Sequence, residues 1–455
     1  MMKRISIIIL SLTIISCSFA PKYSRPVINL PEADNKTNTM INKKWWEDFK
    51  DKNLEKLVEE SLKNNDNLLI AYEKINELEA AFNLSKANLY PSINGSGSVS
   101  RFQTSDEASV TGKGLNTNDY KLSASTVFEV DIFGKLKNKS KSQLSLLLAQ
   151  KSYADTVKLK LISDTISTYL EICASNLQIN KLNSIVDNYK KSYEYRQKQF
   201  RNGIVSNLIL KQEEAKLNSS YLTLENILGS KKVLENTISF ITGKQPDEIF
   251  NSKEISCSNL PSPIQLPPML PSEIIQNRPD IISAEENLKS TNFEIGVAKA
   301  AYFPSISLTG SLGLESYELS NLMQSSAKFW NIGGSLTAPI FDFGRIKANV
   351  KVANSRQKQA LINYIYTVKN AFKEIHEAFI QLENISKKIQ IQRRLLQDYY
   401  EILNIAKSQY ENGLIDYINV IDAERNIENL NIEIINLNKE YLKQQVFLYK
   451  AMGIN

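Results

Sequence analysis

The sequence FRNGIVSNLILKQEE at Phe200–Glu214 returns as YENGLIDYINVIDAE at Tyr410–Glu424, about 210 residues later. The same offset pairs Phe133-Gly134-Lys135 with Phe343-Gly344-Arg345. A slightly larger offset, about 213 residues, relates two further segments, Tyr90-Pro91-Ser92-Ile93 and Phe303-Pro304-Ser305-Ile306. A repeated unit of this length indicates a duplicated half of the molecule, so the sequence predicts a pseudo-symmetric fold.

Very long helices are predicted on both sides of the repeated turns. Glycine and proline are absent from Lys135 to Asn202 and from Arg345 to Asn412, about 68 residues in each case. At ~1.5 Å per residue, a continuous helix of that length reaches roughly 100 Å. Two Asn-Gly pairs, Asn202-Gly203 and Asn412-Gly413, are typical of helix ends with glycine at the exit. Each half is therefore predicted to contain a long helical hairpin, at 135–243 and 345–453.

Residues on these helices keep a heptad frame, which predicts coiled-coil packing within each hairpin. Before the second turn the frame holds Ile389, Gln392, Leu396, Tyr399, Leu403, Ala406 and Tyr410. After that turn it holds Val420, Ala423, Ile427, Leu430, Ile434, Leu437 and Tyr441. The first half repeats the frame at Ile179, Leu182, Val186, Tyr189, Tyr193, Arg196 and Phe200.

Four segments alternate with period two and are predicted as strands, at about 92–103, 120–132, 305–315 and 332–342. Thr104–Asp119 separates the first two as a polar loop. Segments of about ten residues with this alternation are typical of transmembrane barrels, apolar toward lipid and polar toward a lumen. A half-buried soluble sheet alternates in the same way. The export signal described below and the long helices favour the membrane.

Four strands are too few to close a barrel around a lumen. An open sheet edge in lipid would leave backbone groups without hydrogen bonds, so several chains must share one barrel. The predicted fold class is therefore α plus transmembrane β, from a duplicated half-unit. Three chains would build a trimeric 12-stranded barrel, with twelve long helices in a ring. The family resemblance given below implies that these helices form a long α-helical coiled-coil-like periplasmic tunnel.

The N-terminus predicts export and lipidation. Lys3-Arg4 precede the apolar run Ile5–Ile15, which is too short to span a bilayer as a mature helix. The run ends in Ile14-Ile15-Ser16-Cys17, which resembles the bacterial lipoprotein box, with lipid attachment at Cys17. Two acyl chains there would anchor the mature chain stably. The alternative is an ordinary cleaved signal with an incidental cysteine.

The positions of proline, tryptophan and cysteine indicate how the rest of the chain is organised. The predicted segments are a signal peptide at 1–16, a lipidated tether at 17–49, a first repeat at 50–260, a Pro-rich linker at 261–271 and a second repeat at 272–455. Trp45-Trp46 open a first helical region, which continues as one amphipathic helix to about Leu89. Cys173 and Cys257 lie far apart in sequence and are interpreted as unpaired thiols.

Several function classes are excluded by the composition. The formal charge is +6, but lysines are interspersed with glutamates, so no nucleic-acid interface is predicted. The single histidine, His376, has no ligand partner at metal-binding spacing, and no catalytic set or phosphate-binding loop occurs. We expect a non-enzymatic protein with no metal and no cofactor, apart from covalent lipid on Cys17.

The chain resembles the outer membrane efflux proteins of the TolC family, in their lipid-anchored OprM/NodT-like branch. Beside the lipoprotein box and the doubled Asn-Gly turn, the resemblance rests on Ala20-Pro21-Lys22-Tyr23, Trp45-Trp46, Arg278-Pro279-Asp280-Ile281, Ala300-Ala301-Tyr302-Phe303-Pro304 and Phe341-Asp342-Phe343-Gly344-Arg345. It covers essentially the whole mature chain.

The resemblance implies a homotrimeric duct that is lipid-anchored in the outer membrane, with most of its mass in the periplasm. Small molecules, such as drugs or other toxic compounds, would leave through it. They would be delivered by a periplasmic adaptor and an inner-membrane pump, usually of the proton-driven resistance-nodulation-division type. The hairpin turns at Asn202, Gly203, Asn412 and Gly413 would face the adaptor.

The resemblance also implies a gate near the second hairpin turn. The branch's pattern of a large aliphatic residue, Asp four later and Arg three after that matches Ile418, Asp422 and Arg425. A threefold ring of Asp422 carboxylates would attract cations, and Ile418 would narrow the pore. The alternative is an exposed ion pair worth well under ~1 kcal/mol. Gln212 and Ala215 occupy the first-half positions, so one hairpin alone would supply the ring.

Two other function classes stay open at this point. One is a periplasmic coiled-coil adaptor or structural lipoprotein without a pore. The other is a secreted hydrolase, against which the missing catalytic set argues. Within the duct class, drugs, metal ions or a secreted polypeptide are all conceivable cargo, and the lipid anchor favours small molecules by analogy.

Overall fold

A computed structural model describes residues 18–28, 44–108, 112–250, 255, 257–264 and 277–454. These residues divide into two compact units. We call the first the sheet unit; it holds the described residues within 1–28, 74–150 and 283–365. We call the second the helical unit; it holds those within 29–73, 151–282 and 366–455. Each predicted repeat contributes to both units, so the spatial division runs across the sequence duplication.

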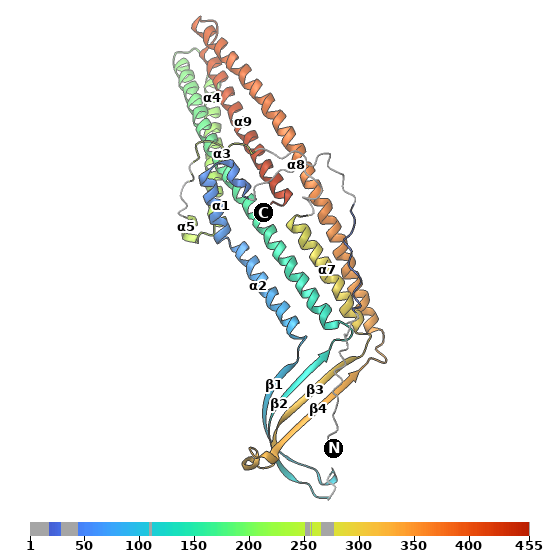
Figure 1. Cartoon of the computed structure of the whole chain (residues 1–455). Coiled ribbons are helices and arrows are strands. Elements are labelled where there is room, and N and C mark those ends of the chain that lie inside the picture. The colour runs from blue at the N-terminus through green and yellow to red at the C-terminus, as the bar shows by residue number, and fades with distance from the viewer. Residues whose placement is uncertain are drawn as a thin grey trace. The chain divides into compact units, whose positions relative to one another are not determined.

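The four predicted strands are confirmed and form one antiparallel sheet in the order β1-β2-β3-β4 (Figure 1). Their bounds are β1 Ser92–Gln103, β2 Asn116–Val130, β3 Ser305–Ser316 and β4 Lys328–Thr337. The predicted bounds of the fourth strand, 332–342, are wrong by several residues at each end. Pro339 lies inside the predicted segment, and its missing N–H cannot join a ladder, so β4 ends before it.

The register aligns the alternating faces of all four strands. Ala124, Leu312 and Trp330 are cross-strand neighbours on one face, as are Ser125, Ser311 and Asn331 on the other. Leu312 and Trp330 are 65% and 76% exposed, so the apolar face is not covered by the chain itself. The sheet is apolar on one side and polar on the other across its whole width.

The helices repeat in matched pairs. The bounds of the first half are α2 Asp66–Ala87, α3 Lys135–Arg201 and α4 Asn207–Ile241. Their counterparts are α7 Pro279–Ala300, α8 Arg345–Glu411 and α9 Tyr417–Met452. Helices α3 and α8 have 67 residues each, and α2 and α7 have 22 each. Shorter elements are η1 Trp45–Phe49, α1 Lys52–Asn64, η2 Asp106–Ala108, α5 Pro246–Phe250, η3 Leu319–Asn321 and η4 Ser325–Ala327.

The predicted single helix from the Trp45-Trp46 region to Leu89 is wrong, because Asn65 interrupts it. Its side-chain amide donates to the carbonyl of Ile241 at the end of α4, at 2.9 Å. Its side-chain oxygen accepts the N–H of Leu68, as an N-cap of α2 does. The chain therefore ends α1 at Asn64 and restarts as α2 at Asp66.

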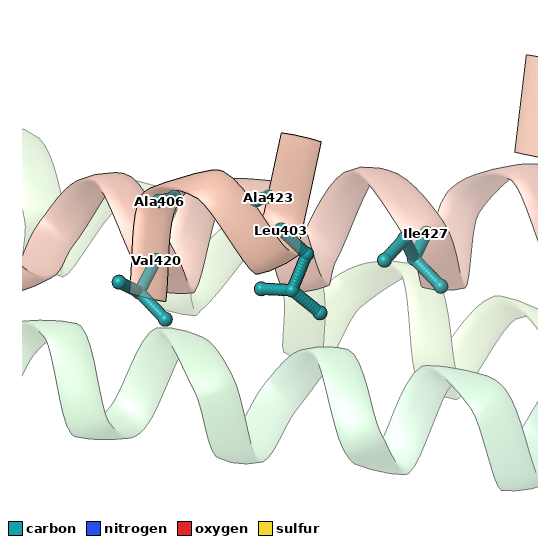
Figure 2. Close-up of a cluster of buried hydrophobic side chains, with 5 residues drawn as sticks. All are labelled: Leu403, Ala406, Val420, Ala423 and Ile427. Atoms are coloured by element: carbon teal, nitrogen blue, oxygen red, sulfur yellow. The ribbon is translucent and has the colours of Figure 1, made fainter. Parts of the chain in front are cut away.

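The predicted heptad seam of the second hairpin is confirmed in the helical unit. Figure 2 shows Leu403 and Ala406 of α8 clustered with Val420, Ala423 and Ile427 of α9. All five side chains are buried, and Leu396, Tyr399, Ile415 and Tyr417 pack against them. The 3,4 spacing therefore brings the two helices of this hairpin together as a coiled coil does.

The interpretation of Cys173 and Cys257 as unpaired thiols is wrong: the two residues form a disulfide. The cysteines are 84 residues apart, and α3, with Cys173 buried in it, meets the chain that follows α5. Asn176 of α3 also donates to the carbonyl of Ile255, at 2.9 Å. A large sequence separation does not argue against a disulfide here, because a helical hairpin brings residues that are distant in sequence side by side.

The described part of the predicted tether, residues 18–28, has no regular secondary structure but makes specific contacts in the sheet unit. Phe19 stacks on Phe303 with ring centroids 4.4 Å apart, and Asn292 donates to the carbonyl of Pro21. Arg25 forms an ion pair with Glu285 at 2.8 Å. The predicted lipid site Cys17, the signal peptide and linker residues 265–271 lie outside the described residues.

Among the described residues, no helix combines the length and the apolar character needed to cross a bilayer.

Candidate constriction and hairpin turns

The two repeated turns have the same backbone geometry. Gly203 and Gly413 have φ of 71° and 69°, in the left-handed region where glycine is favoured. The N–H of Ile204 bonds to the carbonyl of Gln199, and that of Leu414 bonds to the carbonyl of Gln409, each at 2.9 Å. These are Schellman ends, which satisfy the last carbonyls of α3 and α8.

The turns also present apolar side chains outward. Ile204 and Leu414, one residue past each glycine, are 66% and 72% exposed. Asn202 and Asn412 are exposed beside them. The duplicated motif therefore places two similar apolar tips on the helical unit.

Asp416 ties the second turn to the first hairpin. It is the N-cap of α9, and its carboxylate accepts the N–H of Ile418. The same carboxylate accepts a hydrogen bond from Arg196 of α3 at 3.0 Å and another from the hydroxyl of Tyr195. Burial alone would raise the pKa of Asp416, but these donors outweigh it and lower that pKa below its ordinary value.

The three predicted gate residues lie on the first turns of α9 but differ in environment. Ile418 is half-buried. The Asp422 side chain is 47% exposed, whereas the Arg425 side chain is 9% exposed. Asp422 and Arg425 form an ion pair one helical turn apart. The acidic group is therefore presented to solvent, and its basic partner is buried.

Arg425 is held by residues that belong to the first hairpin. Its guanidinium lies over the ring of Tyr189, 4.2 Å from the ring centroid. Glu213 of α4 is a nearby negative charge, 5% exposed, that accepts from Ser192 at 2.7 Å and from Lys216 at 2.9 Å. Burial lowers the pKa of Arg425, and Tyr189 and Glu213 offset part of that effect.

Glu213 and Asp416 are the residues that the sequence reasoning missed. Glu213 is the repeat counterpart of Ala423, so a carboxylate occupies a heptad-frame position that is apolar in the other half. The charged residue at a predicted seam position could have identified this site from the sequence, because charged groups are buried only with partners. No comparable signal in the sequence points from Asp416 to Arg196.

A shallow groove of about 330 Å³ lies beside the acidic group. Its lining includes Ile402 and Ile405 of α8 with Asn419, Asp422 and Asn426 of α9. A single chain offers one carboxylate there. Among the described residues, no group of three His, Cys, Asp or Glu side chains is placed to hold a metal ion.

Comparison with known proteins identifies the family of the chain. The sequence model of the family described as outer membrane efflux protein matches residues 57–244 and 270–454. The cation efflux system protein CusC of Escherichia coli is 31% identical to the chain, over 97% of the chain and 96% of its own length. The toluene efflux pump outer membrane protein TtgI of Pseudomonas putida is 27% identical, over 96% and 95%.

The fold is also similar to a solved channel. The crystal structure of the Campylobacter jejuni CmeC outer membrane channel matches with a TM-score of 0.89 and 30% identity. The match covers 96% of this chain and 95% of that one. The similarity therefore extends over both the sheet unit and the helical unit.

Proposed function

The chain belongs to the outer membrane efflux protein family, and from this membership we propose that three copies form the exit duct of a tripartite efflux system. The protein is an outer-membrane efflux component, as its relatives are. The duct conducts passively, and the energy for export comes from the inner-membrane pump. Transport is the activity assigned to the chain, and no chemical step is proposed.

One observation carries this proposal: the sheet has one continuous apolar face and two edge strands without partners in the described chain. In hydrocarbon such edges leave N–H and C=O groups without hydrogen bonds. Further copies of the same chain supply the missing strands, and closure around a lumen places the polar face inward. An adaptor or structural lipoprotein without a pore would need no such sheet.

We propose that the duct narrows at Ile418, Asp422 and Arg425. The exposed Asp422 carboxylates of three copies would form a negative ring, with Ile418 one turn away. Arg425 fixes α9 against the first hairpin through Tyr189 and Glu213 and stays out of the opening. The ring would favour cations and slow the passage of anions while the duct is closed.

The partners of the duct are a periplasmic adaptor and an inner-membrane pump of the resistance-nodulation-division type. The exposed tips at Gly203 and Gly413 are the proposed adaptor surface, since apolar side chains on fixed turns suit a protein partner. Cys17 is the proposed lipid attachment site. The proposed cargo is small molecules; CusC is named for cations and TtgI for toluene.

The gate is tested by single-channel recording of the purified, lipidated protein in planar bilayers. Asp422→Ala should raise the conductance and weaken the cation preference. Gln212→Ala, at the counterpart position in the first hairpin, is the matched control and should change neither. Conductance that is unaltered by Asp422→Ala would remove the gate assignment, and a protein that never conducts would remove the duct.

A further inference from the structure

The exposure of the strands shows where the sheet is incomplete. Every residue of β1 is exposed, and so is nearly every residue of β4, whereas β2 and β3 are half-covered. Ile93 near the start of β1 is 78% exposed, and Ile340, three residues past the end of β4, is 99% exposed. Their counterparts on the inner strands, Ile306 and Val130, pair with each other and are half-buried.

The two halves are similar enough that the strand register in one half predicts the register in the other. Adding 213 to β1 residues and 210 to β2 residues converts the pair Ile93 and Thr126 into Ile306 and Leu336, which are partners in β3 and β4. The two hairpins therefore have the same pairing. The seam between β2 and β3 should then have a counterpart between β4 and β1. Four strands are too few to close on themselves, so this β1 strand must come from another copy of the chain.

An aromatic contact marks the inner seam. Phe133, just after β2, stacks on Phe303, just before β3, with centroids 4.8 Å apart and planes 20° apart. The same offsets lead from Phe133 to Phe343 and from Phe303 to Tyr90. Phe343 and Tyr90 are 91% and 64% exposed. Phe343, which packs edge-on against Phe341, and Tyr90 thus keep exposed rings at the two edges of the sheet, where the duplication predicts a stacked pair.

We propose that β4 of one chain pairs with β1 of a second copy in the register of the inner seam, and that Phe343 stacks on Tyr90 of that copy. Transferring the inner pairs Ser125–Ser311 and Thr126–Gly310 gives Ser335 opposite Ser98 and Leu336 opposite Gly97. Both transferred pairs keep apolar residues on the apolar face and serines on the polar face. The inference rests on the proposed shared sheet and adds its register and its aromatic clasp.

Phe19 makes the two kinds of seam different. Its ring stacks on Phe303 and lies 6.4 Å from Phe133, so the N-terminal segment covers the inner clasp. Phe343 has a different ring beside it, because Phe341 packs edge-on against it with ring centroids 4.4 Å apart. The two seams therefore differ in the residue that accompanies the clasp, which is Phe19 at the inner seam and Phe341 at the seam between copies.

Cysteine pairing tests the register in outer membranes that contain the full-length chain. Ser335→Cys with Ser98→Cys should give covalently linked copies on mild oxidation, because opposed residues have Cβ atoms about 4.5–5.5 Å apart. Ser125→Cys with Ser311→Cys is the matched control, since it should link the same positions of the inner seam within one chain. Ser335→Cys alone is the control for links that form through Cys17. The slipped pairs, Ser335→Cys with Ser96→Cys or with Ser100→Cys, should link several-fold less.

The outcomes separate this inference from the proposed function. Links formed best by a slipped pair would overturn the register while leaving a sheet shared between copies. If no pair links and the detergent-solubilised protein is monomeric by native mass measurement, the shared sheet itself fails. Efficient linking by the Ser335 and Ser98 cysteines, at the level of the inner control, supports the proposed seam.

A double-mutant cycle tests the clasp. Phe343→Ala and Tyr90→Ala should each weaken assembly of the copies, and the double variant should lose little more than either single one. The expected coupling is roughly twofold to tenfold in the association constant, which is the range of aromatic pairs. Tyr317→Ala is the control, since Tyr317 is 71% exposed but follows the end of β3 that lies away from Phe303 and its clasp. Additive effects, or none, would overturn the clasp.

Discussion

Near the second turn, one residue supplies the charge of the proposed constriction, and two others hold α9 in place. Asp422 presents charge to solvent, whereas Arg425 and Asp416 connect α9 to the first hairpin. The anchoring residues come from α3 and α4, although the proposed opening is lined from α9. The two hairpins of one chain are therefore coupled through a few polar side chains.

Replacing Arg425 by Gln should destabilise the helical unit. The change removes a positive charge near the buried Glu213 and the cation–π contact with the Tyr189 ring, at a cost of roughly 2 kcal/mol. Denaturant unfolding of the purified protein measures this loss. Arg393→Gln, on the exposed surface of α8, is the control and should change stability little. Equal effects of the two substitutions would contradict the role given to Arg425.

The Asp416 tie should depend on pH in a predictable direction. The pKa of this carboxylate is lower in the folded protein than its unfolded value of about 4. Its stabilisation is therefore fully present above that value and is lost as the pH falls through the lower, folded pKa. The melting temperatures of wild type and Asp416→Asn should differ at pH 6 and converge in strong acid.

Ser206 provides the control for this pH effect. It is the counterpart N-cap of α4, but its side chain makes no cap hydrogen bond. Ser206→Ala should therefore lower the melting temperature little at any pH. A difference between wild type and Asp416→Asn that stays constant down to pH 3 would show that the carboxylate is not the group that titrates.

At the scale of elements, the disulfide fixes the chain after α5 to α3. Replacing both Cys173 and Cys257 by Ala should cost about 2–4 kcal/mol of stability, because the unfolded chain loses a cross-link that spans 84 residues. Hydrogen exchange should rise around Ile255 and Ile264, which bond to side chains of α3, α4 and α9.

The change in stability on adding a reductant tests whether the disulfide is the source of this stabilisation. Wild-type protein should lose stability when reduced, and the double alanine variant should be indifferent to reductant. A bond of this kind also fits an oxidising compartment, which agrees with export from the cytoplasm. If reductant lowers the melting temperature of both proteins equally, the disulfide is not the source of the effect.

Two glycines should respond to alanine with opposite signs. Gly413 has φ of 69° at the end of α8, so Gly413→Ala should destabilise the turn by about 1 kcal/mol. Gly229 lies inside α4 with open space around the position of an added Cβ, so Gly229→Ala should stabilise by about 0.5–1 kcal/mol. Melting temperatures compare the two directly. The same sign for both would mean that the backbone at Gly413 is not held left-handed.

At the scale of the whole molecule, the two faces of the sheet should tolerate charge differently. Leu312→Lys places an ammonium on the apolar face, where lipid contact costs about 2–4 kcal/mol near the bilayer midplane. Ser311→Lys, the next residue along β3, places it on the polar face. The heat-resistant assembly recovered from outer membranes should fall sharply for the first change and little for the second. The reverse order would mean that the faces are assigned the wrong way round.

The sequence alone determined the duplication, the four strands, the long hairpins and the second-hairpin seam. Each of these is recorded in local periodicity or in glycine and proline placement, which depend on neighbouring residues only. The same reasoning misplaced β4 and joined α1 to α2, because Pro339 and Asn65 were outweighed by the surrounding pattern.

Only the tertiary structure decided which distant groups meet. The Cys173–Cys257 disulfide, the contact of Arg425 with Tyr189, the tie between Asp416 and Arg196 and the stack of Phe133 on Phe303 all join residues far apart in sequence. Their partners are set by where helices of a given length return and where strands come into register. Those are properties of the assembled fold, and no single segment of the chain contains them.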